Sequence, residues 1–214
     1  MDNLSKYIDH TILKPEATKE DIKRICEEAK EYKFKAVCIN PIYVKYASEV
    51  LKNTDVLVAT VIGFPLGNNL PKVKAYETEL ALEDGADEID MVINIAAVKN
   101  KEYILVKNDI ESVVKASKDK VVKVIIETCL LTKEEIVKSS EIILEAGANF
   151  VKTSTGFSTG GAEIEDVELI KSVVKNKAKI KASGGIRNRE KAIKMIEAGA
   201  DRIGASSSIN IVKG

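Results

Sequence analysis

The most constraining feature of this sequence is its regular alternation of short apolar runs with longer amphipathic segments. Runs of strand character occupy residues 7–13, 36–40, 56–62, 88–94, 121–128, 150–154, 179–183 and 202–205. Helical patterns fill the intervals at about 18–32, 41–52, 71–84, 102–118, 132–146, 163–175 and 188–198, with a short last helix from Ser206. Consecutive strands that are joined through helices pair in parallel, so the sequence predicts an α/β fold.

Three of the expected helices end in nearly the same way, with the segments LEDGAD (82–87), LEAGAN (144–149) and IEAGAD (196–201). Each segment places a glycine just after the last helical turn and runs directly into an apolar strand. Eight strands with such joints, and no GxGxxG motif after the first strand, favour a (β/α)8 TIM barrel over an open doubly wound sheet. We expect an additional N-terminal helix as well.

The chain has 214 residues, whereas a barrel of this kind typically needs about 250, so the connecting loops must be short. No Pro-rich or Gly/Ser-rich linker interrupts the pattern, and we expect residues 1–214 to form a single domain. Thr18 and Thr132 each stand three residues before an acid and are the expected N-caps of their helices.

Charge and composition exclude several classes of partner. The 33 basic and 33 acidic residues leave no net charge to hold nucleic acid or an anionic membrane. No signal sequence or membrane-spanning run is present, so a cytoplasmic protein with reduced thiols is expected. Cys38 and Cys129 are interpreted as packed thiols, and His10, the single histidine, as a structural imidazole. One histidine cannot build a multi-histidine zinc site, so we expect catalysis without a metal or cofactor.

Lys152 is the candidate nucleophile, because it lies inside an apolar strand whose period of two places it on one face with Phe150. Burial and a neighbouring cation would both disfavour its ammonium form, as Schiff-base chemistry requires. The alternative is that its amine simply extends to solvent at the strand end. Lys181 supplies a second lysine at the end of another strand, and Asp90 an acid inside a third.

Other polar residues in or at the ends of the expected strands are Asp9, Thr11, Asn40, Asn94, Lys123 and Glu127. Lys123 and Glu127 lie on one face of the same expected strand and are interpreted as an ion pair within the barrel. The role of Asp9 stays open, since it is equally compatible with a structural position and with the site.

Small residues follow the last three strands and predict a phosphate-binding site. They are Thr155 and Gly156, Gly184 and Gly185, and Ser206 and Ser207. Glycines let backbone N–H groups approach a phosphate closely, and the loops after strands seven and eight form the usual phosphate site of this barrel. Arg187 could add charge there or belong to the first turn of the next helix.

Five motifs resemble those of the class I deoxyribose-phosphate aldolase family: IDHTILKPEAT (8–18), AVCINP (36–41), EIDMVIN (88–94), VKTSTGF (151–157) and KASGGIR (181–187). The similarity runs nearly end to end. It implies reversible cleavage of 2-deoxyribose 5-phosphate into glyceraldehyde 3-phosphate and acetaldehyde. It also implies that Lys152 forms the Schiff base, that the charge of Lys181 lowers the pKa of Lys152, and that Asp90 relays protons through water.

The chain departs from this family at its C-terminus. Many members carry a tail that ends in a tyrosine near the site, whereas the last tyrosine here is Tyr103. Proton transfer is therefore expected to rely on Asp90, Lys181 and water. We expect residues 211–214 to follow the last helix and to contribute less than about tenfold to proton exchange.

Two alternatives remain open on the residues alone. A different Schiff-base enzyme acting on phosphorylated sugars or ketones would show every feature above. A non-catalytic sugar-phosphate-binding barrel would keep the glycine loops, but it would not need the second buried lysine, Lys181. The expected partners are a phosphorylated sugar and acetaldehyde, with homo-oligomerisation left open.

Overall fold

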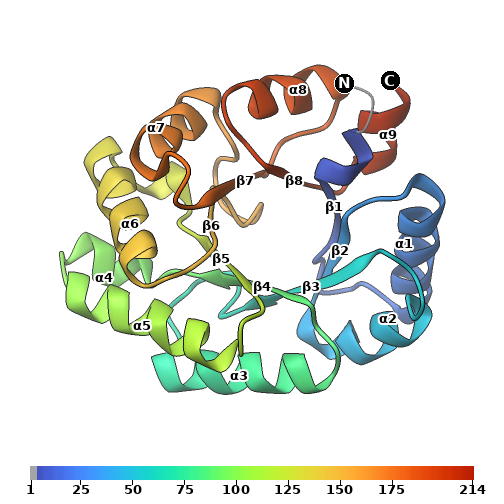
Figure 1. Ribbon diagram of the computed structural model, residues 1–214, viewed down its shortest axis with the longest axis horizontal. Helices are drawn as coiled ribbons and strands as arrows, with labels where there is room; N and C mark the ends of the chain where they lie inside the picture. The colour runs from blue at the N-terminus through green and yellow to red at the C-terminus, as the bar shows by residue number, and fades with distance from the viewer. Residues whose placement is uncertain (1–3) are drawn as a thin grey trace.

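The computed structural model describes residues 4–214. Within that range eight parallel strands pair in sequence order, and the last pairs with the first to close a barrel. The strands are β1 (Ile8–Ile12), β2 (Ala36–Ile39), β3 (Leu57–Ile62), β4 (Glu88–Val92), β5 (Val121–Ile125), β6 (Phe150–Lys152), β7 (Lys179–Ser183) and β8 (Arg202–Ala205). The predicted (β/α)8 barrel is therefore confirmed, and Figure 1 shows the strands at its centre inside a ring of helices.

The helices also follow the predicted order. They are α1 (Lys19–Tyr32), α2 (Val44–Val50), α3 (Pro71–Glu83), α4 (Ile95–Lys99), α5 (Tyr103–Ala116), α6 (Lys133–Glu145), α7 (Ile164–Val174), α8 (Arg189–Glu197) and α9 (Ser208–Lys213). The expected N-terminal helix is a single 3-10 turn, η1 (Leu4–Tyr7), and two further 3-10 turns are η2 (Pro41–Tyr43) and η3 (Thr128–Leu130). The sequence patterns did not predict α4, which has only five residues and begins after Asn94, whose side chain caps it.

Local sequence explains where several helices begin and end. Thr18 and Thr132 both form capping boxes with the acid three residues later, as predicted. The three glycines of the repeated joints, Gly85, Gly147 and Gly199, have φ values of 102°, 78° and 116°, which side chains of L-residues rarely adopt. Short joints therefore turn each helix directly into the next strand, which keeps the barrel small.

The hydrophobic core has two parts. The larger part fills the space between the outer faces of the strands and the surrounding helices. The smaller part lies inside the barrel at β2 and β3, where Ala36, Cys38, Ala59 and Val61 pack together. Charged side chains occupy the rest of the interior. The inside of the barrel is therefore apolar beside β2 and β3 and ionic elsewhere.

Within residues 4–214, no helix is both long and apolar enough to cross a bilayer. The cytoplasmic location and the single domain over residues 1–214 stay predictions.

Candidate active site

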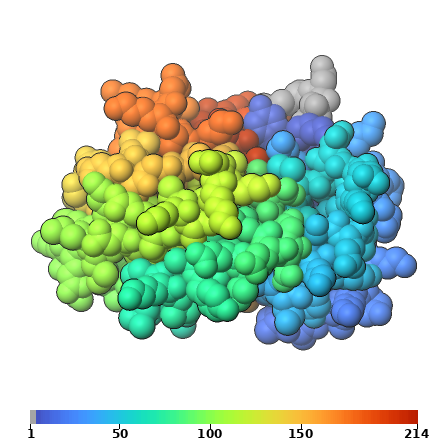
Figure 2. Space-filling view, turned by 60° about the horizontal axis from the view of Figure 1, so that its bottom comes forward, coloured from blue at the N-terminus to red at the C-terminus, as the bar shows by residue number. Residues whose placement is uncertain are grey.

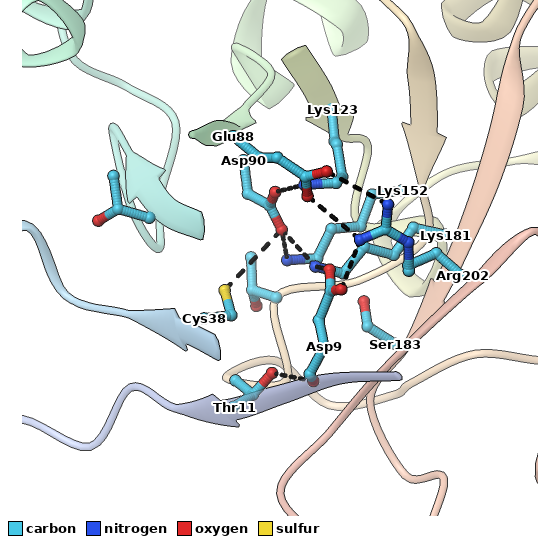
Figure 3. A network of polar contacts seen from close by, with 12 residues as sticks. Asp9, Thr11, Cys38, Glu88, Asp90, Lys123, Lys152, Lys181, Ser183 and Arg202 are labelled. Carbon is cyan, nitrogen blue, oxygen red and sulfur yellow. Dashed lines mark hydrogen bonds and ion pairs between the residues drawn. The ribbon is translucent and has the colours of Figure 1, made fainter. Parts of the chain in front are cut away.

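Strand register places the two predicted catalytic lysines side by side. Lys152 on β6 is the direct partner of Lys181 on β7, and both side chains point into the barrel. Both ammonium nitrogens lie 2.7 Å from the same atom, Oδ2 of Asp90 on β4. All three side chains are buried, so the structure brings together the residues that the sequence singled out (Figure 3).

Asp90 and Lys181 also belong to a closed ring of alternating charges, which we call the ion-pair ring. In order around it stand Asp90, Lys123, Glu88, Arg202, Asp9 and Lys181. Successive contacts include 2.8 Å from Lys123 Nζ to Asp90 Oδ1, 2.6 Å from Lys123 Nζ to Glu88 Oε2, and 2.7 Å from Arg202 to Asp9 Oδ1. Among residues 4–214, Asp90 is the one ring member that forms an ion pair with Lys152.

Electrostatics separates the roles of the two lysines. Burial lowers the pKa of Lys152 below its ordinary value; the Asp90 carboxylate opposes that fall, and the Lys181 ammonium adds to it. Burial acts on Lys181 in the same direction, but Asp9 and Asp90 outweigh it and raise the pKa of Lys181. Lys181 therefore keeps its proton while Lys152 is the amine that can lose one.

The carboxylates stay ionised for the same reason. Burial alone would raise the pKa of Asp90, yet the ammonium groups of Lys123, Lys152 and Lys181 hold it well below its ordinary value. Burial opposes ionisation of Asp9 too, but the surrounding cations, led by Lys181 and Arg202, lower the pKa of Asp9 to about 2. Asp9 thus has a structural and electrostatic place in the site, which settles the question that its sequence position left open.

A cavity of about 420 Å³ opens above this network at the C-terminal ends of the strands. Lys152 lines it, whereas Lys181 and Asp90 lie behind it without exposed surface. Of the predicted phosphate residues, those that line the cavity are Thr155, Gly156, Gly184, Gly185 and Ser206. The cationic side chains Lys14 and Arg187 also line it, and Arg187 precedes α8 rather than entering its first turn.

The geometry brings a lysine amine with a lowered pKa to a cavity of about 420 Å³, and comparison with known proteins shows the family of the chain. Residues 4–214 match the family described as DeoC/LacD family aldolase. The chain belongs to the DeoC/LacD aldolases. A deoxyribose-phosphate aldolase from Finegoldia magna is 61% identical over 99% of each chain.

Solved structures of similar proteins share the fold of this aldolase. An aldolase called QR15 superposes with a TM-score of 0.96 at 47% identity, covering 100% of this chain and 96% of its own. A tetrameric deoxyribose phosphate aldolase from Aeropyrum pernix has a TM-score of 0.92 at 36% identity, covering 98% of this chain and 89% of its own.

Sequence reasoning missed three residues that shape the site of this aldolase. Gly204 on β8 faces Lys181, and a Cβ atom there would lie 3.1 Å from Lys181 Cε, so glycine leaves room for the lysine stem. Arg202 and Glu88 were also overlooked as a pair, although both stand at the start of apolar strands. A charged residue at the first position of an inward-facing strand is the signal that could have found them.

The predicted ion pair between Lys123 and Glu127 is wrong. β5 ends at Ile125, and Glu127 adopts a left-handed backbone with φ of 56°, which turns its side chain away from Lys123. The Glu127 carboxylate instead accepts hydrogen bonds from the backbone N–H and the hydroxyl of Thr155. Glu127 therefore fixes the loop that follows β6 of this aldolase.

The packed thiol predicted for Cys38 and the structural imidazole predicted for His10 are confirmed, whereas the packing predicted for Cys129 is wrong. Cys38 is a buried thiol that contacts Asp90 Oδ2 at 3.9 Å, as expected for a packed cysteine, whereas Cys129 in η3 is exposed. His10 is a satisfied structural imidazole, with ring nitrogens 2.9 Å from Ser208 Oγ and 2.6 Å from Glu28 Oε2. Ser207 does not line the cavity, and the last helix begins at Ser208 rather than at the predicted Ser206, with Ser207 as its N-cap residue.

The C-terminal residues are not a tail beyond the last helix, as the sequence suggested. Residues 211–213 form the last turns of α9, and Ile211 is fully buried in the core. Deleting residues 211–214 would remove core packing, so such a truncation would report on stability rather than on proton transfer. In the aldolase as described from residue 4, no group of three or more His, Cys, Asp and Glu side chains could hold a metal ion. The metal-free mechanism stays a prediction.

Proposed function

We propose that this aldolase reversibly cleaves 2-deoxy-D-ribose 5-phosphate into D-glyceraldehyde 3-phosphate and acetaldehyde through a Schiff base on Lys152. The single observation that carries the proposal is the unequal placement of the two lysines. Lys152 reaches the cavity and has a lowered pKa, whereas Lys181 is sealed behind it between two carboxylates. An accessible amine with a lowered pKa favours the neutral form that nucleophilic attack on an aldehyde requires.

In the proposed mechanism the neutral amine of Lys152 attacks C1 of the open-chain sugar, and loss of water from the carbinolamine leaves an iminium ion. Removal of the proton from the C3 hydroxyl then breaks the C2–C3 bond. Its electrons move into the iminium to form an enamine, and glyceraldehyde 3-phosphate leaves. Protonation of the enamine at C2 and hydrolysis of the imine release acetaldehyde and restore Lys152.

The protein supports these steps from behind the cavity. Lys181 stays cationic and so favours the neutral form of Lys152 before attack. In this proposal Asp90 passes protons between Lys152 and water entering beside it, which the 2.7 Å contact between Asp90 Oδ2 and Lys152 Nζ supports. The phosphate is proposed to lie along the glycine and serine loops near Arg187 and Lys14, two cations that line the same cavity.

Borohydride trapping with acetaldehyde, followed by peptide mass mapping, tests the nucleophile directly. We expect the label on Lys152 in the native enzyme and no label in Lys152→Ala. A label on Lys181 would reverse the assignment of the two lysines. Turnover of deoxyribose 5-phosphate against ribose 5-phosphate and unphosphorylated deoxyribose then tests the substrate, because a Schiff-base enzyme for another sugar phosphate would prefer a different member of this panel.

We also propose that the enzyme is a homo-oligomer that associates through α3. Four large apolar side chains, Leu70, Val73, Tyr76 and Leu80, are exposed on or beside this helix. Figure 2 shows the neighbouring surfaces of α3 in teal and α5 in yellow-green on one face. Ile104 in α5 is also exposed. A monomer rarely exposes so contiguous an apolar face, and the relative from Aeropyrum pernix is tetrameric.

Sedimentation velocity of Val73→Glu tests this association, because a charge at the centre of the face should produce smaller particles. The matched control is Leu130→Glu, which changes an exposed leucine of η3 outside the four apolar residues of this face and should leave the particle size unchanged. Equal behaviour of the two variants would remove α3 as the contact surface.

A further inference from the structure

The interior of the barrel holds more positive than negative groups. Four cationic side chains, Lys123, Lys152, Lys181 and Arg202, share the space with three carboxylates, Asp9, Glu88 and Asp90. Three of the cations alternate with the three carboxylates in the ion-pair ring, so the ring as a unit is neutral. Lys152 is the fourth cation and has no carboxylate of its own.

We propose that the Arg202–Glu88 pair at the far side of the ring sets the protonation state of Lys152 by holding the ring at zero net charge. The proposal rests on the role of Lys152 as the Schiff-base nucleophile. Neither member of the pair touches the cavity, so both act as positioning residues and not as catalytic ones.

The contacts of the pair show how it acts at a distance. The two terminal nitrogens of Arg202 donate hydrogen bonds to the two carboxylate oxygens of Glu88, each at 3.2 Å. Arg202 Nη1 also donates a hydrogen bond to Asp9 Oδ1. Glu88 also forms an ion pair with Lys123 at 2.6 Å. Lys123 in turn pairs with Oδ1 of Asp90, the carboxylate oxygen that Lys152 and Lys181 do not contact. The pair therefore connects the two routes, through Lys123 and through Asp9, that lead to the carboxylate holding Lys152.

The surroundings of the Lys152 amine leave few other groups that could set its charge. Asp90 on β4 forms an ion pair with the amine, and the like charge of Lys181 on β7 repels it. Cys38 on β2 contacts the same carboxylate oxygen of Asp90. Burial raises the pKa of the Cys38 thiol, so it stays neutral. Behind these groups stand the other members of the ring, Lys123, Glu88, Arg202 and Asp9, and the cations Lys14 and Arg187 line the cavity in front.

Opposite changes at the two ends of the pair must then have opposite effects. Arg202→Met leaves the ring with one excess negative charge, which favours the proton on Lys152 and raises its pKa. Glu88→Gln leaves one excess positive charge and lowers it further. A single buried charge within about 10 Å, acting through an effective dielectric of about 20, shifts a pKa by roughly one unit.

Neither substitution leaves an isolated buried charge. Without the Arg202 guanidinium, Glu88 still pairs with Lys123, and Asp9 still pairs with Lys181. Without the Glu88 carboxylate, Lys123 still pairs with Asp90 and Arg202 with Asp9. The variants therefore change the charge of the ring more than they disrupt its contacts.

The test is the pH dependence of kcat/KM, whose acid limb reports the ionisation of the free enzyme's essential amine. We expect this limb to move by roughly one pH unit upward in Arg202→Met and downward in Glu88→Gln. The double variant Arg202→Met/Glu88→Gln restores a neutral ring and should return the limb to its native position. Structural damage would instead accumulate in the double variant.

Two controls separate charge from packing. Arg202→Lys keeps the cation and should keep the native limb. Phe150→Leu removes an aromatic side chain without changing any charge. The cationic groups of Lys123, Lys179 and Arg202 lie 5.7–5.9 Å from the centroid of the Phe150 phenyl group. This variant should leave the limb unmoved. If Arg202→Met does not fold, the downward shift in Glu88→Gln and the native limb of Arg202→Lys still test the idea.

Failure of this inference is distinguishable from failure of the proposed function. If borohydride trapping labels Lys152 in the native enzyme, the nucleophile is correct whatever the pH profiles show. The charge-balance inference is overturned if Arg202→Met and Glu88→Gln move the limb in the same direction, if neither moves it, or if the double variant lies further from the native enzyme than either single variant. Absence of the label on Lys152 would overturn the proposed function itself.

Discussion

Replacing Lys181 by leucine removes the cation nearest to Lys152 and should make Lys152 a worse nucleophile at neutral pH. Both ammonium nitrogens lie 2.7 Å from Asp90 Oδ2, so they are at most 5.4 Å apart. Two unit charges about 5 Å apart interact by about 3 kcal/mol at an effective dielectric of about 20, which corresponds to roughly 2 pKa units. The same substitution leaves Asp90 with one fewer cation, which also favours the proton on Lys152.

The direction of the pH effect follows from the form of the amine that reacts. In the proposed mechanism Lys152 attacks when neutral, and its pKa is lowered in the native enzyme, so native activity should extend to lower pH than an ordinary lysine would allow. A higher pKa in Lys181→Leu moves the acid limb of kcat/KM upward. At pH 7 the neutral fraction, and with it the rate of imine formation, should fall on the order of 100-fold.

The assay is kcat/KM for deoxyribose 5-phosphate between about pH 6 and pH 10, together with the rate of borohydride trapping by acetaldehyde. Activity of Lys181→Leu should recover as the pH rises, and Lys181→Arg, which keeps a cation, should recover at a lower pH than Lys181→Leu. A loss of activity that is equal at every pH would refute the electrostatic role, and would mean that Lys181 acts as an acid or through packing.

Three further predictions follow from other contacts. Lys152→Ala should abolish turnover and trapping while the circular dichroism spectrum stays native, and residual trapping would reveal a second reactive amine. Gly184→Val places a side chain 3.0 Å from Gly161 Cα and should raise KM for the phosphorylated sugar far more than for deoxyribose; equal effects would put the phosphate elsewhere. Ile211→Ala should destabilise the fold by about 2–4 kcal/mol in urea unfolding, and a change below about 0.5 kcal/mol would contradict its core role.

The sequence by itself determined most of the barrel. Periodicity and the repeated glycine joints located all eight strands to within a few residues, because these are local properties of the backbone and of burial. It also identified Lys152, Lys181 and Asp90, since a charged residue inside an apolar strand is visible without knowing what it touches. Helix α4 escaped because a five-residue helix has too few turns to show a period.

Only the tertiary structure decided how the charges pair. Lys123 and Glu127 are four residues apart and matched in charge, yet a left-handed residue after β5 sends Glu127 to Thr155 and leaves Lys123 to Glu88 and Asp90. Which lysine reaches the cavity is equally non-local, because it depends on carboxylates that β1 and β4 bring across the barrel. Coulomb interactions act between groups that are near in space, and closure of the barrel brings Asp9 to Lys181, 172 residues further along the chain.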